Sequence, residues 1–267
     1  MLIVELRKLV ARPRTWVTIA LLAGLPVLVA ILLRVTGVGP RPGEGPAFLS
    51  QVLNNGALFP AAALALVLPV FLPVAVSVIA GDAVAGEANH GTLRYLLARP
   101  VGRTHLLAVK LAVVAVFVFL AVVITAAIAF AVGAGLFGVK PLPGVSGQTI
   151  AAQDATWRTV VTVFYVGFSM LGVASVALFF STMTDSPLAA ALGALAVLVT
   201  SQVLDLLDAA AVLQPYLPTH YWLAFVDLFR NPVLWRNVAR GFALQGVYVA
   251  VLLGAAWANF ATKDITS

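Results

Sequence analysis

The 267-residue chain contains no cysteine and few charged side chains. The absence of cysteine excludes a disulfide framework and a thiolate metal site. Charged residues make up 10% of the chain and hydrophobic residues 62%, whereas about a quarter of the residues in soluble domains are charged. This composition excludes an ordinary soluble domain and predicts an integral membrane protein.

The sequence also lacks the pattern of a nucleic-acid-binding protein, although its net charge is +6. Its basic residues lie beside apolar stretches and form no stripe with interleaved aromatic residues. Lysine and arginine next to apolar spans set the orientation of a membrane protein. We therefore expect membrane lipid, and no nucleic acid, among the partners of the chain.

Motifs that bind nucleotides or catalyse hydrolysis are missing. A P-loop requires GxxxxGK followed by Ser or Thr, but the nearest stretch, residues 133–140, has Val139 where the lysine must stand. None of the three histidines begins the HExxH motif of a metalloprotease. After Ser169, the second glycine of a GxSxG elbow is replaced by Leu171. We expect no intrinsic catalytic site and no cofactor bound by this chain.

Six apolar stretches are long enough to cross a bilayer, which requires about 20 residues of helix. They are Trp16 to Val35, Leu58 to Ala80, Leu111 to Phe137, Thr159 to Phe180, Pro187 to Leu204 and Gly241 to Phe260. The sequence therefore predicts an all-α integral membrane protein with six transmembrane helices in a single domain, residues 1–267. Within the second span, Pro69 and Pro73 indicate either a tolerated kink or a broken helix of the kind found in transporters.

Basic residues near the ends of the spans predict the orientation. Four of them, Arg7, Lys8, Arg12 and Arg14, precede the first span, and lysine and arginine favour the cytoplasmic side. We therefore place both termini and residues 81–110 in the cytoplasm. Frequent alanine and valine suggest a bacterial chain, for which the location is the plasma (inner) membrane.

Residues 81–110 form a polar island between the second and third spans. Leu93, Leu96 and Leu97 would lie on one side of a short amphipathic helix that ends in the turn at 99–103. Displacing such a helix must move both flanking spans, so it is a mechanical part. The alternative is an interfacial loop helix whose arginines extend toward the headgroups.

Two further polar features leave alternatives open. Residues 1–15 predict a short helix at the cytoplasmic interface or, alternatively, a basic tail that serves only orientation. Asp82 and Glu87 resemble an acid/base or metal pair, but we expect them to cap helices or to pair with Arg94 and Arg99.

Three stretches together resemble the ABC-2 type permeases, the membrane subunits of type V ABC exporters. The island matches with Asp82, Glu87, Gly91-Thr92-Leu93, Leu96-Leu97, Pro100, Arg103 and Lys110. The opening Glu5-Leu6-Arg7-Lys8 is similar to the start of that family, and Leu217 to Trp222 with Phe260 to Ser267 are similar to its close. The resemblance thus extends over the whole chain.

The resemblance implies a connecting helix at residues 1–15, a coupling helix within 81–110 and an outer loop at 205–240 with a short re-entrant or interfacial helix before the last span. The coupling helix would dock on a separate ATP-binding subunit, present in two copies, that holds ATP and magnesium. Docking residues by this resemblance are Glu87, Gly91, Thr92, Leu93, Arg94, Tyr95, Leu96, Leu97, Arg99, Pro100 and Arg103. Those of the connecting helix are Glu5, Arg7 and Lys8.

From these features we expect a permease subunit that pairs with a second permease, identical or related. It would export an amphipathic or lipid-like compound, a drug, an antibiotic or a peptide. The alternatives are an ion-coupled secondary transporter, which would bury charged residues near the middle of its spans, and a membrane scaffold that transports nothing.

Overall fold

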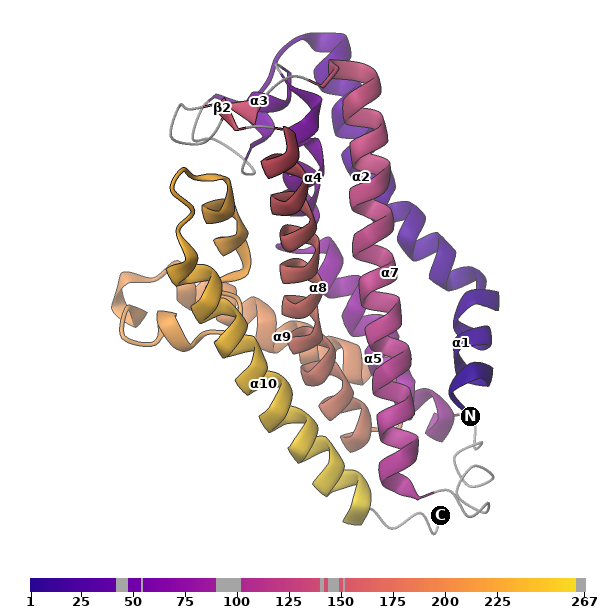
Figure 1. The fold of residues 1–267 in the computed structure, drawn as a ribbon. Helices are drawn as coiled ribbons and strands as arrows, with labels where there is room; N and C mark the ends of the chain where they lie inside the picture. Colours follow the sequence, from indigo (N-terminus) through magenta and orange to yellow (C-terminus); the bar gives the residue numbers. More distant parts are fainter. Residues whose placement is uncertain are drawn as a thin grey trace.

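The computed structural model is a bundle of long helices (Figure 1). It describes residues 1–41, 48–53, 55–89, 102–139, 142–143, 149–150 and 152–262. The strands in this part of the chain are β1 (Leu142–Pro143) and β2 (Thr149–Ile150), which pair antiparallel. The rest of the regular structure in these ranges is helical, as predicted.

Six helices are long and apolar enough to cross a membrane, which confirms the predicted number of spans. They are α2 (Pro13–Thr36), α5 (Phe71–Asn89), α7 (Arg103–Phe137), α8 (Ala152–Met183), α9 (Pro187–Asp205) and α10 (Trp235–Thr262). The shortest has 19 residues, or about 28 Å at 1.5 Å per residue, close to the thickness of the hydrocarbon core. The chain is a multi-pass membrane protein.

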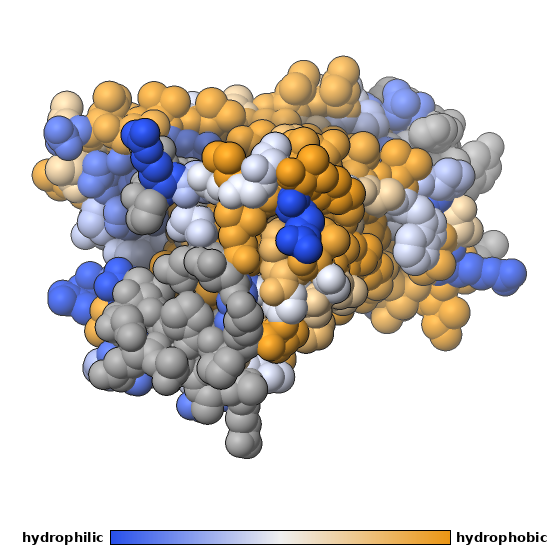
Figure 2. Space-filling model, turned by 90° about the horizontal axis from the view of Figure 1, so that it is seen from above, coloured by the Kyte–Doolittle hydropathy of each residue, from blue (hydrophilic) through white to orange (hydrophobic). Residues whose placement is uncertain are grey.

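Burial differs strongly among these helices. The apolar stretches of α5 and α8 are the most buried, and those of α9 and α10 the least. Apolar side chains such as Leu192 and Val251 face outward from the less buried helices. Figure 2, a view down the bundle, shows hydrophobic residues over much of the surface and hydrophilic residues in separate clusters. This distribution suits a bundle surrounded by hydrocarbon.

The second span is broken, so the prediction of one helix from Leu58 to Ala80 was wrong. The 3₁₀ helix η1 (Gly56–Leu58) leads into the buried α4 (Phe59–Val67), and a turn at 68–70 separates α4 from α5. Pro73 has no N–H to donate to the carbonyl of Pro69 four residues earlier. The side-chain nitrogen of Gln202 on α9 donates to that carbonyl instead, at 2.6 Å. The chain is therefore broken at these prolines rather than kinked within one continuous helix.

Other helix ends follow local sequence signals. Ser186 accepts a hydrogen bond from the N–H of Ala189 at 3.3 Å, and Pro187 begins α9, as predicted. At the other end of the chain, α1 (Leu2–Ala11) stops because Arg12, which precedes a proline, is extended. Pro13 then begins α2, so these two helices meet at a sharp corner.

The segment between α9 and α10 folds back onto the bundle as short 3₁₀ helices: η2 (Asp208–Ala210), η3 (Gln214–Tyr216) and η4 (Trp222–Phe229). η4 packs on α8 and α10 and buries Trp222, Phe225 and Phe229. Phe48, just before α3 (Leu49–Val52), packs edge-on against Phe229 with the ring centres 4.9 Å apart. Short helices therefore lie in the loop where the sequence predicted them.

The N-terminus and the last described residues of α10 lie at the same end of the bundle (Figure 1). The helix α1, the start of α7 and the end of α10 share this end, whereas α3 and β2 lie at the opposite one. α5 continues to Asn89, beyond the predicted end of its span at Ala80. The last turns of α5 therefore extend the span into the predicted polar island.

Candidate functional site

Helix α1 lies with its charged side toward the bundle and much of its apolar side away from it. Glu5 and Leu9 are buried, with 7% and 6% of their surface exposed, whereas Ile3 is 81% exposed. Val10, seven residues after Ile3, lies on the same outward face, and Val10 and Val4 are both exposed. Such a helix is stable when lipid covers its outer face.

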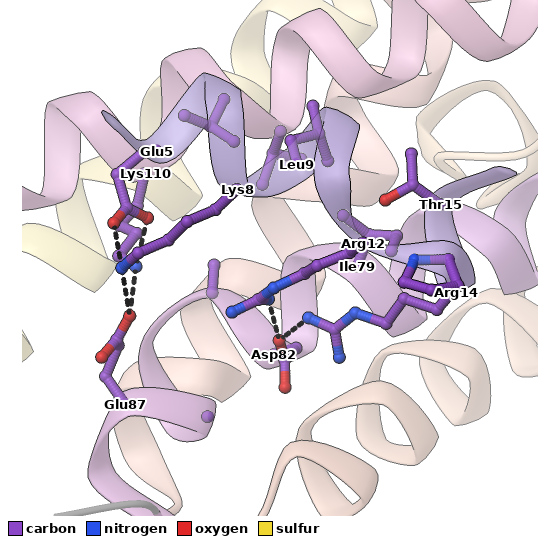
Figure 3. Close-up of a pocket in the computed structure, with 15 residues that line it drawn as sticks. Glu5, Lys8, Leu9, Arg12, Arg14, Thr15, Ile79, Asp82, Glu87 and Lys110 are labelled. Carbon is purple, nitrogen blue, oxygen red and sulfur yellow. Dashed lines mark hydrogen bonds and ion pairs between the residues drawn. The ribbon is translucent and has the colours of Figure 1, made fainter. Parts of the chain in front are cut away.

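An ion network joins α1 to the end of α5 and the start of α7 (Figure 3). The Lys110 ammonium on α7 lies 2.8 Å from the Glu5 carboxylate and 2.9 Å from that of Glu87 on α5. Lys8 is 2.8 Å from the other oxygen of Glu5. The Lys110 side chain is only 7% exposed, so α1 and the two span ends meet at this buried lysine.

The network balances its own charge, with two carboxylates and two ammonium groups. Burial alone would raise the pKa of the Glu5 carboxyl, but hydrogen bonds and attraction from Lys110 and Lys8 outweigh burial and lower that pKa below 4.5. Glu5 is therefore ionised at neutral pH. Removing one partner of a buried ion pair costs about 3–5 kcal/mol, so the intact network fixes α1 in place.

A second ion cluster lies along the same face. Asp82 on α5 accepts hydrogen bonds from Arg12, at 3.3 Å, and from Arg14. The expectation that Asp82 caps a helix was wrong, because it lies within α5 rather than at its end. Its ion pairs in the described part of the chain are with these N-terminal arginines, whereas the expected partners Arg94 and Arg99 lie outside the described residues.

The two clusters face a cavity of about 580 Å³ between α1, α2, α5 and α7. Its wall combines the charged side chains of both clusters with apolar ones. The apolar residues include Leu9, Ile79, Val113 and Val114. Figure 3 shows the charged side chains converging from α1, α5 and α7 on this space. The arrangement can hold an amphiphilic ligand or transmit a displacement between helices.

Only part of the predicted docking set can be placed. Glu87, Glu5 and Lys8 come together in the ion network, Arg7 is exposed on α1, and Arg103 is the first residue of α7. The remaining predicted residues lie outside the described residues: Gly91, Thr92, Leu93, Arg94, Tyr95, Leu96, Leu97, Arg99 and Pro100.

The site residues absent from the predicted set are Arg12, Arg14, Asp82 and Lys110. One signal was available, since Glu5, Lys8 and Arg12 share one helical face opposite Ile3 and Val10. Asp82 and Glu87 belong to separate ion clusters. Within the described ranges, no group of three or more His, Asp or Glu side chains is placed to hold a metal ion.

Comparison with known proteins gives one family match. A family model described as a protein of unknown function (DUF2705) matches residues 45–266, which is most of the chain. No curated protein matches the sequence. The matched range includes all the helices from α3 onward and excludes α1 and α2.

Proposed function

We propose that this chain, which belongs to the DUF2705 family of proteins of unknown function, is the membrane permease subunit of an ATP-driven ABC exporter. Two copies of a separate ATP-binding subunit would supply the energy, and a second permease, identical or related, would complete the transport path. The cargo is an amphipathic or lipid-like compound, with drugs, antibiotics and peptides as further candidates.

The observation that carries the proposal is the ion network around Lys110. Glu87 and Lys110 stand on either side of residues 90–101, the segment proposed to dock on the ATP-binding subunit, and Glu5 ties α1 to both. A force applied to that segment would therefore act on three elements together. If this segment were attached to the spans only through its backbone, it could shift without moving them.

Hydrogen bonds from a side chain of α8 to the backbone of α5 support the same mechanism. The Ser181 hydroxyl of α8 accepts hydrogen bonds from the N–H groups of Val84 and Ala85 and donates to the carbonyl of Gly81 at 2.6 Å. A side chain inserted into the backbone ladder of a helix is a recognised cause of kinks. The last turns of α5, from Asp82 to Asn89, can therefore bend relative to the span while remaining attached to α8.

Reconstitution tests the proposal directly. The chain is expressed together with a candidate ATP-binding subunit, identified by a Walker A motif in a neighbouring gene, and is purified and placed in liposomes. We expect a stable complex whose ATP hydrolysis is altered by the chain. Replacing Glu87 with alanine, or Leu96 and Leu97 together, should uncouple hydrolysis from efflux of a fluorescent amphipathic dye while insertion is unchanged. Arg236→Ala, an exposed substitution on α10, is the control.

The break between α4 and α5 favours one other candidate, an ion-coupled secondary transporter, because such transporters use broken helices near their substrate sites. Gln202 donates a hydrogen bond to the Pro69 carbonyl at this break, so the protein itself stabilises the break. The two candidates differ in their energy source. Dye efflux that follows an imposed proton or sodium gradient without nucleotide would favour the secondary transporter and contradict the proposal.

A further inference from the structure

We infer that the cavity between α1, α2, α5 and α7 binds the phosphate group of an acidic membrane lipid. The inference requires only that the chain lies in a membrane, so it does not depend on an ATP-binding partner. It follows from three features of the cavity: its charge, an unpaired hydroxyl group and an apolar wall.

The cavity carries a net positive charge. Its lining includes three carboxylates, Glu5, Asp82 and Glu87, and four cations, Lys8, Arg12, Arg14 and Lys110. The two lysines balance Glu5 and Glu87, but the two arginines share a single Asp82 oxygen. Each guanidinium has five N–H donors in a planar fork that matches phosphate oxygens. One positive charge and several donors are thus available to an anion.

A buried hydroxyl group lies at the same place. Thr15 lines the cavity and has no exposed surface, and its Oγ1 has no hydrogen-bond partner among the described residues. Figure 3 shows this oxygen turned toward Arg12. Buried polar groups in proteins are nearly always hydrogen-bonded. A phosphate oxygen held by Arg12 and Arg14 is an acceptor that would satisfy Thr15.

The apolar wall distinguishes a lipid from a free anion. Leu9, Ile79 and Val113 also line the cavity, and inorganic phosphate would leave these apolar side chains uncovered. The cavity volume, about 580 Å³, lies within the roughly 300–1,000 Å³ of small-molecule sites. The apolar outer face of α1 places the cavity at headgroup depth, where a phosphate and the start of an acyl chain are both available.

Lipid titration of the purified chain in detergent tests the inference. Dioleoylphosphatidylglycerol, dioleoylphosphatidylcholine and inorganic phosphate are added separately, and native mass spectrometry and thermal unfolding are measured. We expect one phosphatidylglycerol to be retained per chain, with a saturable rise in unfolding temperature. Equal effects of phosphatidylcholine would overturn the inference, because the charge would then be irrelevant. Equal stabilisation by inorganic phosphate would overturn the lipid as occupant.

Three variants separate binding from folding. Arg14→Gln leaves Arg12 paired with Asp82 but removes the excess charge, so phosphatidylglycerol affinity should fall by about 10-fold. Thr15→Val should lower that affinity by several-fold, while the lipid-free protein unfolds at no lower a temperature because an unsatisfied hydroxyl has been removed. Arg34→Gln, at the far end of α2, should leave affinity unchanged. The inference fails if Arg14→Gln and Thr15→Val bind phosphatidylglycerol as the native chain does.

Discussion

Replacing Lys110 with methionine should release α1 from the bundle. Methionine keeps the length and apolar stem of lysine but removes the ammonium group that contacts both Glu5 and Glu87. Two carboxylates would then face each other in a largely buried place with Lys8 as their remaining cation in the network. The chain escapes this cost by moving α1, which carries Glu5, out toward water and the headgroups.

The size of the effect follows from burial. Lys110 is 7% exposed, and removing one partner of a buried pair costs about 3–5 kcal/mol. At about 1.4 kcal/mol per factor of ten, a loss near 3 kcal/mol raises the undocked population about 100-fold. Lys8 contacts the same Glu5 but is 44% exposed, and exposed pairs contribute at most about 1 kcal/mol. Lys8→Met should therefore change undocking by less than about 5-fold.

Cysteine labelling measures this difference, because the native chain contains no cysteine. Leu9 is 6% exposed on the inward face of α1, so Leu9→Cys introduces one protected thiol. Its rate of reaction with a small maleimide reports the undocked population in the native, Lys110→Met and Lys8→Met backgrounds. Equal labelling rates in the two lysine variants would refute the reasoning, since burial would then not determine which lysine holds α1.

Three further predictions concern pH and packing. Folding lowers the pKa of the Glu5 carboxyl from 4.5. The contribution of this carboxylate to α1 docking is therefore complete above pH 4.5 and is lost as the pH falls through the pKa of the folded protein. A nitroxide label on α1 whose mobility increases between pH 7 and 5 would contradict this. A Cβ on Gly172 would lie 1.9 Å from the Gln245 side-chain oxygen. Gly172→Ala should therefore reduce the free energy of unfolding by about 1–3 kcal/mol and lower the unfolding temperature. Gly246→Ala, whose added Cβ meets nothing within 4 Å, should leave that temperature unchanged. Ser181→Ala leaves buried groups on α5 unpaired and should cost about 1–3 kcal/mol; Ser175→Ala, which loses only a bond within its own helix, should cost less in the same melting assay.

The spans could be predicted because crossing a bilayer imposes one requirement on composition and length. Apolar runs such as Thr159 to Phe180 met this requirement, and for the shorter run from Pro187 to Leu204, Ser186 marked the helix start by its capping chemistry. The break at residues 68–70 was less predictable. Two prolines weaken a helix, but whether it kinks or breaks depends on a distant group such as Gln202 that accommodates the freed carbonyl.

The site was predicted in part for a similar reason. Glu5, Lys8 and Glu87 were identified from local motifs. Lys110, which pairs with Glu5 and Glu87, lies 105 positions from Glu5. Pairing over such a distance depends on how α1 turns back at Pro13 and which face it presents. The sequence places Glu5 and Lys8 on the side of α1 opposite Ile3 and Val10, but it does not say which side faces the bundle. Outside a membrane, the opposite orientation would be favoured.

Cysteine labelling at Leu96 tests whether residues 91–100 receive force from an ATP-binding subunit in the cytoplasm, as we propose. A membrane-impermeant maleimide is added to right-side-out and to inverted vesicles that contain the Leu96→Cys chain and its ATP-binding partner. We expect labelling only in inverted vesicles, and protection of the introduced thiol when the partner is present. Labelling of that thiol from the outer face, or labelling that is unaffected by the partner, would contradict it.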